Sequence, residues 1–167
     1  MNFASDIKNG AFYQIFHIDD YVREFNFPAK ISKLELKNNF HVSLLKIPLE
    51  NLTDEIREKL EKVGAENRDL LMENPPKLNG KFSRIVDTDR ERETVIAFVD
   101  FPSVEKWRAK IREILPDVKF AIPHTTLYTY NCEGIFLNSE EDIKKMTREL
   151  DAEMSQILRE KWEAKNA

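Results

Sequence analysis

A histidine followed two places later by a hydroxyl residue occurs twice in this chain, each time just before a leucine. The first pair is His41 and Ser43, and the second is His124 and Thr126. Both pairs lie in apolar, β-branched stretches that are typical of strands. Because side chains alternate between the faces of a strand, each histidine should share a face with its hydroxyl residue. Each stretch therefore presents an imidazole and a hydroxyl side by side on a rigid element.

Two imidazoles and two hydroxyls suit the displacement of an oxygen at a phosphate ester. One group must take a proton from the incoming water or 2′-hydroxyl, and another must protonate the leaving oxygen. Histidine can do either because its ordinary pKa lies near neutral pH. Hydroxyl donors held in place, here Ser43 and Thr126, can stabilise the charge that develops on the phosphate oxygens. This scheme requires no metal, and we expect no cofactor.

The alternation of strand faces also assigns the neighbours of the two motifs. Tyr128 and Tyr130 fall on the face of His124, where they would line the site and stack on a base, or else pack on the sheet. Lys46 is out of phase with His41 and is expected to point away from the site. The alternation thus adds two tyrosines to the candidate substrate-binding residues and no basic residue.

The composition is that of one globular domain spanning residues 1–167. The chain is 41% hydrophobic and 34% charged, with a formal net charge of −4, so its surface as a whole should not attract long nucleic acids. Cys132 is the only cysteine, which excludes an internal disulfide and suits a reducing compartment. No secretory signal or apolar run of spanning length is evident. We therefore expect a cytoplasmic monomer that makes no membrane contact.

Hydrophobic periodicity predicts an α+β fold. We expect strands at 11–18, 31–36, 40–47, 77–86, 93–101 and 124–130, and helices at 52–71, 103–115 and from 139 almost to the C-terminus. Residues 1–10 should form a short helix or an arm, 19–28 an irregular connection, and 135–137 a short strand. The most apolar run, 95–99, should be a central strand. His17 falls in the first strand, and we interpret it as a half-buried strand histidine. The order suggests two related halves, each a small antiparallel sheet backed by helices.

The two motifs resemble the signature of the 2H phosphoesterase superfamily, a His-x-Ser/Thr-x sequence that is repeated once about eighty residues later. They read His41-Val42-Ser43-Leu44 and His124-Thr125-Thr126-Leu127, and the two histidines are 83 residues apart. The superfamily includes bacterial 2′-5′ RNA ligases, 2′,3′-cyclic phosphodiesterases and U6 RNA phosphodiesterases. The resemblance extends to the layout of the chain, but its specific part is these eight residues.

The resemblance implies a bilobal fold, with two antiparallel sheets around a central cleft. It also implies that His41 and His124 are the acid–base pair and that Ser43 and Thr126 bind the phosphate. The implied substrates are RNA with a 2′,3′-cyclic phosphate end, a 2′-5′-linked oligonucleotide, a cyclic nucleotide or an ADP-ribose cyclic phosphate. We therefore expect a metal-independent phosphodiesterase whose partner is an RNA end, a short oligonucleotide or a cyclic nucleotide.

Three other interpretations of the histidines stay open from the sequence. The first is a metal site, which would need further ligands such as Cys132 or Glu133, although no close ligand spacing is present. The second is a module that binds RNA ends or nucleotides in the same cleft without catalysis. The third is a pair of core histidines on unrelated strands.

Overall fold

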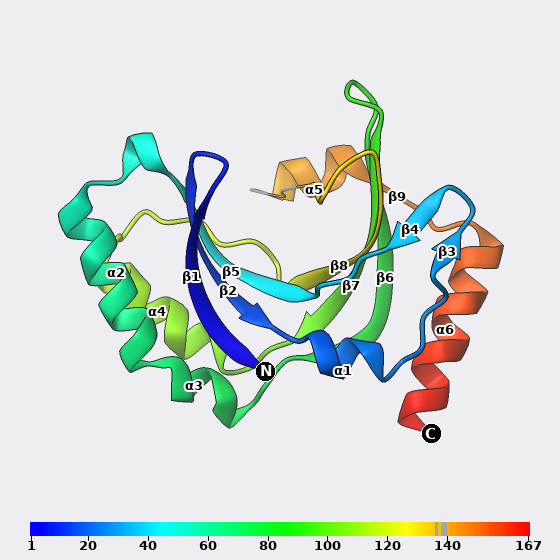
Figure 1. Cartoon of the computed structure of the whole chain (residues 1–167), viewed down its shortest axis with the longest axis horizontal. Helices are drawn as coiled ribbons and strands as arrows, with labels where there is room; N and C mark the ends of the chain where they lie inside the picture. The colour runs from blue at the N-terminus through cyan, green and yellow to red at the C-terminus, as the bar shows by residue number, and fades with distance from the viewer. Residues whose placement is uncertain (136, 138–139) are drawn as a thin grey trace.

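The computed structural model describes residues 1–135, 137 and 140–167 and shows an α+β protein with two antiparallel sheets (Figure 1). The first sheet has the strand order β1-β2-β5, and the second has the order β3-β4-β8-β7-β6-β9. Strand β5, at an edge of the first sheet, and strand β8, inside the second, lie beside each other and carry the two motifs. The predicted fold class is thus confirmed at this level. Within the described residues, no helix is both long enough and apolar enough to cross a membrane.

The first sheet begins earlier in the chain than the sequence suggested. It consists of β1 (Asn2–Lys8), β2 (Ala11–His17) and β5 (His41–Pro48). The prediction of a helix or arm at residues 1–10 is wrong, because β1 pairs along its whole length with β2. The turn is formed by Asn9 and Gly10, both with positive φ (51° and 73°), and Asn-Gly is a strong signal for such a two-residue hairpin.

The second sheet contains the predicted hairpin at its centre. Its strands are β3 (Lys30–Ile31), β4 (Leu34–Leu36), β6 (Lys77–Asp87), β7 (Arg92–Asp100), β8 (His124–Tyr130) and β9 (Thr147–Arg148). The apolar run 95–99 lies in β7, between β8 and β6, so the prediction of a central strand is confirmed. The weak strand predicted at 31–36 is instead two very short paired strands, β3 and β4.

The helices follow the predicted order with two differences. They are α1 (Asp19–Arg23), α2 (Asp54–Glu66), α3 (Arg68–Glu73), α4 (Val104–Ile114), α5 (Glu140–Met146) and α6 (Ala152–Asn166), with a 3₁₀ turn at Leu49–Asn51. Residues 19–23 form a short helix where we expected only an irregular connection. In addition, the helix predicted for 52–71 is divided in two at Asn67.

The single long helix predicted from residue 139 is also wrong. It is interrupted where β9 pairs with β6, and α6 then starts afresh with the Asp151 carboxylate accepting a hydrogen bond from the Met154 amide at 2.8 Å. An N-cap of this kind satisfies a free amide and favours a new helix start. The predicted helix start at Ser139 and the predicted strand at 135–137 involve residues that lie outside the described part of the chain.

The same β-β-α-β order occurs twice. The first unit is β1-β2-α1-β5, with β3 and β4 inserted before β5, and the second is β6-β7-α4-β8. In each unit the last strand pairs with the second strand and carries the histidine motif at its start. The two motifs therefore occupy equivalent places in the fold.

The main core lies on the faces of the sheets that are turned away from the motif histidines. Val42, Leu44, Leu127 and the fully buried Trp107 of α4 belong to this one apolar cluster. In Figure 1, α2 and α4 lie together beside the first sheet, and α6 lies beside β6 of the second. Burial of one face of each strand fixes its orientation and leaves the histidines on the other face.

Candidate functional site

A β-bulge follows the hydroxyl residue of each motif. In β5, Ser43 is paired with Ile15, but the next paired residue is Leu45, opposite Gln14. In β8, Thr126 is paired with Ile96, and the next paired residue is Tyr128. The extra residue is a leucine in both strands, three places after the histidine. The two motifs thus have the same local backbone irregularity as well as similar sequences.

The bulge reverses the alternation of faces beyond each motif. Tyr128 is fully buried, and its hydroxyl donates a hydrogen bond to the Pro28 carbonyl at 2.7 Å. Tyr130 is exposed, pairs with Glu93 rather than with a residue of the histidine face, and has the Lys33 ammonium 4.5 Å from its ring centroid. The prediction that these two tyrosines share the face of His124 is therefore wrong.

The bulge in β5 also puts Lys46 on a different face of the sheet from the one predicted. Lys46 pairs with Tyr13. Tyr13, Ile15 and His17 occupy every second position of β2 and therefore share one face. Since His17 lies opposite His41, Lys46 falls on the histidine face. The prediction that it points away is wrong because it assumed a strand without a bulge.

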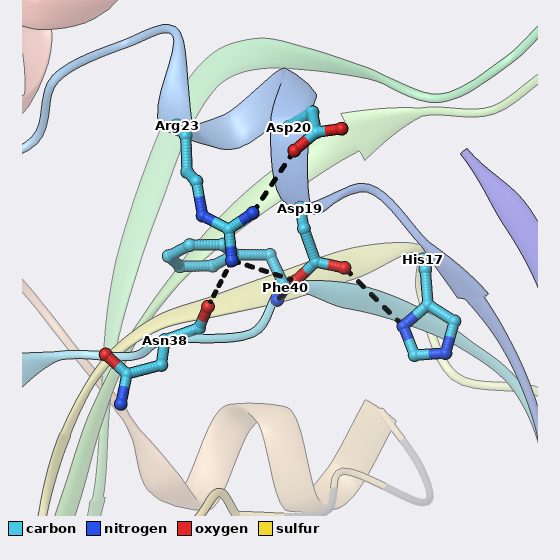
Figure 2. Close-up of polar contacts among 6 residues, drawn as sticks. All are labelled: His17, Asp19, Asp20, Arg23, Asn38 and Phe40. Carbon is cyan, nitrogen blue, oxygen red and sulfur yellow. Dashed lines mark hydrogen bonds and ion pairs between the residues drawn. The ribbon is translucent and has the colours of Figure 1, made fainter.

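His17 lies beside His41, although nothing in the sequence placed it in the site. The two residues form a cross-strand pair, with ring centroids 6.4 Å apart and planes inclined at 75°. His17 is half-buried, as expected, and its Nδ1 lies 3.7 Å from a carboxylate oxygen of Asp19 (Figure 2). The site therefore contains a third imidazole with its own carboxylate.

The segments that lead into the two histidine strands are held in matching ways. An Arg23 guanidinium N–H donates to the Asn38 carbonyl at 2.8 Å (Figure 2). An Arg108 guanidinium N–H donates to the Ala121 carbonyl at 2.6 Å. Each carbonyl belongs to the residue three places before a motif histidine, and each arginine belongs to the helix of its β-β-α-β unit. These bonds fix where each of the two strands begins. They therefore also fix where each imidazole lies.

We expect replacement of Arg108 to destabilise the protein more than the matched replacement of Arg23. Arg108 is 7% exposed, so Arg108→Met leaves the Ala121 carbonyl without its buried donor, at a cost of about 1–3 kcal/mol. Arg23 is more exposed, and water can replace its guanidinium at Asn38. Urea unfolding of the two variants measures the difference, and equal midpoints would contradict this account.

His124 is held in one tautomer by the backbone. Its Nδ1 lies 2.6 Å from the Ile122 carbonyl oxygen, which can only accept, so Nδ1 carries the proton. The other ring nitrogen, Nε2, is then left to exchange a proton with a substrate. This arrangement is the one that a general acid or base on this strand requires.

Both motif histidines favour the neutral form. Burial, followed by the nearby charge of Lys37 and of the other two histidines, lowers the pKa of His41 to about 4, with Asp19 opposing. Burial also lowers the pKa of His124, although its bond to the Ile122 carbonyl acts in the opposite sense. The two motifs, distant in sequence, begin on the neighbouring strands β5 and β8, and the charge of His124 acts on His41.

Two lysines and a glutamate connect the sheets next to this site. The Lys37 ammonium donates to the Glu133 carbonyl at 2.7 Å, and the Lys8 ammonium lies 2.8 Å from the Glu133 carboxylate. Burial lowers the pKa of Lys37. Sequence reasoning missed Lys37 because it lies outside the motif, four residues before His41, and only folding brings Glu133 to it.

The ligands suggested for a metal site are engaged elsewhere. The Cys132 thiol lies 3.8 Å from the Glu93 carbonyl, and the Glu133 carboxylate is paired with Lys8. In the parts of the chain that the structure describes, no three His, Cys, Asp or Glu side chains gather as metal ligands do.

No protein-family model, curated protein or solved structure matches this chain.

Proposed function

We propose that this protein is a metal-independent phosphodiesterase of the 2H type, acting on a 2′,3′-cyclic phosphate or a 2′-5′ phosphodiester of RNA or a nucleotide. The observation that carries the proposal is the equivalence of the two motifs. Each places an imidazole and a hydroxyl at the start of its strand, before a bulge at the same position. The bilobal 2H arrangement, with a cleft between the two sheets, is part of this proposal.

The proposed reaction uses the two rings as a proton-transfer pair. One ring takes a proton from the attacking water as its oxygen bonds to phosphorus, and the other protonates the leaving ribose oxygen as its bond to phosphorus breaks. Ser43 and Thr126 donate hydrogen bonds to the non-bridging oxygens. A bound phosphate anion favours the charged form of both imidazoles, which offsets the lowering of their pKa values.

Hydrolysis of a 2′,3′-cyclic nucleotide in the presence of EDTA tests the proposal directly. We expect a single nucleoside monophosphate product at a rate that EDTA does not change. Binding of the nucleotide without turnover would instead identify a non-catalytic binding module. Activity that EDTA abolishes would show that a metal does the chemistry.

The lowered pKa values predict an acidic optimum. The value of kcat/KM requires one neutral and one protonated ring in the free enzyme. Because both pKa values lie below 6.5, kcat/KM should be highest at acidic pH and should fall again before pH 6.5. The pKa of His41, about 4, sets one limb of this profile.

Removal of the Lys37 charge should move this profile in a known direction. The ammonium disfavours protonation of His41, so Lys37→Met should raise the pKa of His41 and shift the limb it governs to higher pH. Lys59→Met is a suitable control, since Lys59 lies on α2 and pairs with Glu55 at 3.2 Å. A profile of kcat/KM against pH that is the same in Lys37→Met and wild type would contradict the charge assignment.

A further inference from the structure

The histidine face of the first sheet continues well beyond the two motifs. Along β2, Tyr13, Ile15 and His17 share this face and are only half-buried, whereas Phe12, Gln14 and Phe16 on the opposite face are fully buried. The register places His17 beside His41, Ile15 beside Ser43 and Tyr13 beside Lys46. These side chains form a strip, here called the β2–β5 strip, that runs away from the motif histidine of β5.

The equivalent strip of the second sheet is covered. Phe98 lies opposite His124 as His17 lies opposite His41. Phe98 and the neighbouring Ile96 pack in an apolar cluster with Ile135 and Leu137. A substrate that extends beyond the reacting phosphate therefore has an accessible, polar surface on the first sheet and a packed apolar one on the second.

The far end of the β2–β5 strip combines an aromatic ring with a cation. The Lys46 ammonium lies 5.5 Å from the ring centroid of Tyr13. Tyr13 and His17 are four residues apart on one strand, which is about 13 Å at ~3.3 Å per residue. That distance is too long for a lone phosphate to span. Aromatic faces beside cations are the surfaces on which proteins stack the bases of single strands.

The charges around the β2–β5 strip favour an anion. Lys46 lies on the strip itself, Lys37 is close enough to His41 to lower its pKa, and Lys8 of β1 pairs with Ala11 of β2. The acids of the same region among the described residues include Asp6, Asp19 and Glu133. Glu133 is engaged by both Lys8 and Lys37, and Asp19 lies beside His17 and accepts from the Phe40 amide at 2.7 Å. Asp6, opposite Tyr13 at the outer strand, accepts from the Ile7 amide at 2.8 Å.

We propose that the substrate is a short single strand of RNA rather than a lone cyclic nucleotide, and that the nucleotide on the 5′ side of the one carrying the reacting phosphate lies along the β2–β5 strip. In this arrangement His17 contacts the sugar–phosphate backbone and the base stacks on Tyr13. The proposal rests on the phosphodiesterase function and specifies the substrate class for that site.

Adenylate substrates of one, two and three nucleotides, each ending in a 2′,3′-cyclic phosphate, test the proposal. We expect kcat/KM to rise about tenfold or more from the mononucleotide to the trinucleotide, the effect of one stacked base. In Tyr13→Leu the ratio of the two kcat/KM values should fall to near one. Tyr130→Leu is the matched control, because Tyr130 is an exposed tyrosine on the opposite face of its sheet, and it should keep the wild-type ratio.

Equal kcat/KM values for the three lengths, or a ratio that Tyr13→Leu leaves unchanged, would overturn the strip proposal while leaving the phosphodiesterase intact. If none of the three is cleaved, the phosphodiesterase proposal fails instead. The strip is then judged by titrating the wild-type protein with the trinucleotide. Tyr13→Leu is expected to raise the Kd about tenfold, and an unchanged Kd overturns the strip proposal.

Discussion

His41→Ala and His124→Ala are each expected to abolish measurable turnover of a cyclic phosphate while leaving the protein folded. Each ring supplies one of two proton transfers, and loss of a positioned acid or base slows such reactions by about 10²–10⁴-fold. The two rings occupy equivalent positions at the starts of β5 and β8. The losses should therefore be similar, and the double variant should be little worse than either single one. Steady-state kcat for the three variants measures this.

The fold can be checked separately in the same variants. Both rings are half-buried and face away from the main core, so circular dichroism and thermal unfolding should remain close to wild type. Folded variants with wild-type activity would rule the mechanism out. Loss of activity together with loss of the folded state would not count as support, and His41→Gln and His124→Gln would then replace the alanine variants.

The second large effect is expected from the two hydroxyls. Ser43→Ala and Thr126→Val should each lower kcat about 10²-fold, because each removes one donor aimed at the charge that forms on the phosphate oxygens. Both side chains are half-buried on the histidine face of their strands. The rate constants at saturating substrate measure the effect, since a donor that acts on the transition state changes kcat more than KM.

Thr125→Val provides a closely matched control for Thr126→Val. Thr125 is the next residue on the same strand, but it points into the core, and its hydroxyl is buried without a partner among the described residues. Its equivalent in the first motif is Val42. Thr125→Val should keep wild-type kcat, with stability unchanged or improved. Equal losses in Thr125→Val and Thr126→Val would indicate strand damage rather than loss of a phosphate donor.

Much of the local structure was predictable from the residues alone. The alternation within each motif correctly placed His41 with Ser43 and His124 with Thr126 on one face. Periodicity located the β6–β7 hairpin and the central strand at 95–99. These features depend on neighbours within a few positions, so their determinants are visible in the sequence.

Features that depend on pairing between distant strands were not predictable in the same way. Tyr128, Tyr130 and Lys46 were assigned to the wrong faces because the bulges exist only in the register of β5 with β2 and of β8 with β7. The register of β5 with β2 also places His17 opposite His41. Lys37 donates a hydrogen bond to the carbonyl of Glu133, which is 96 residues away in the chain.

The sequence by itself determined which side chains can move a proton or hold a phosphate, since residue type sets that chemistry. The tertiary structure decided which of them meet, how much water reaches them and how far their pKa values move. Hydrogen-bond register, burial and Coulomb interactions act through space between segments that are far apart in the chain. Their effects therefore follow from the fold and not from any stretch of residues read alone.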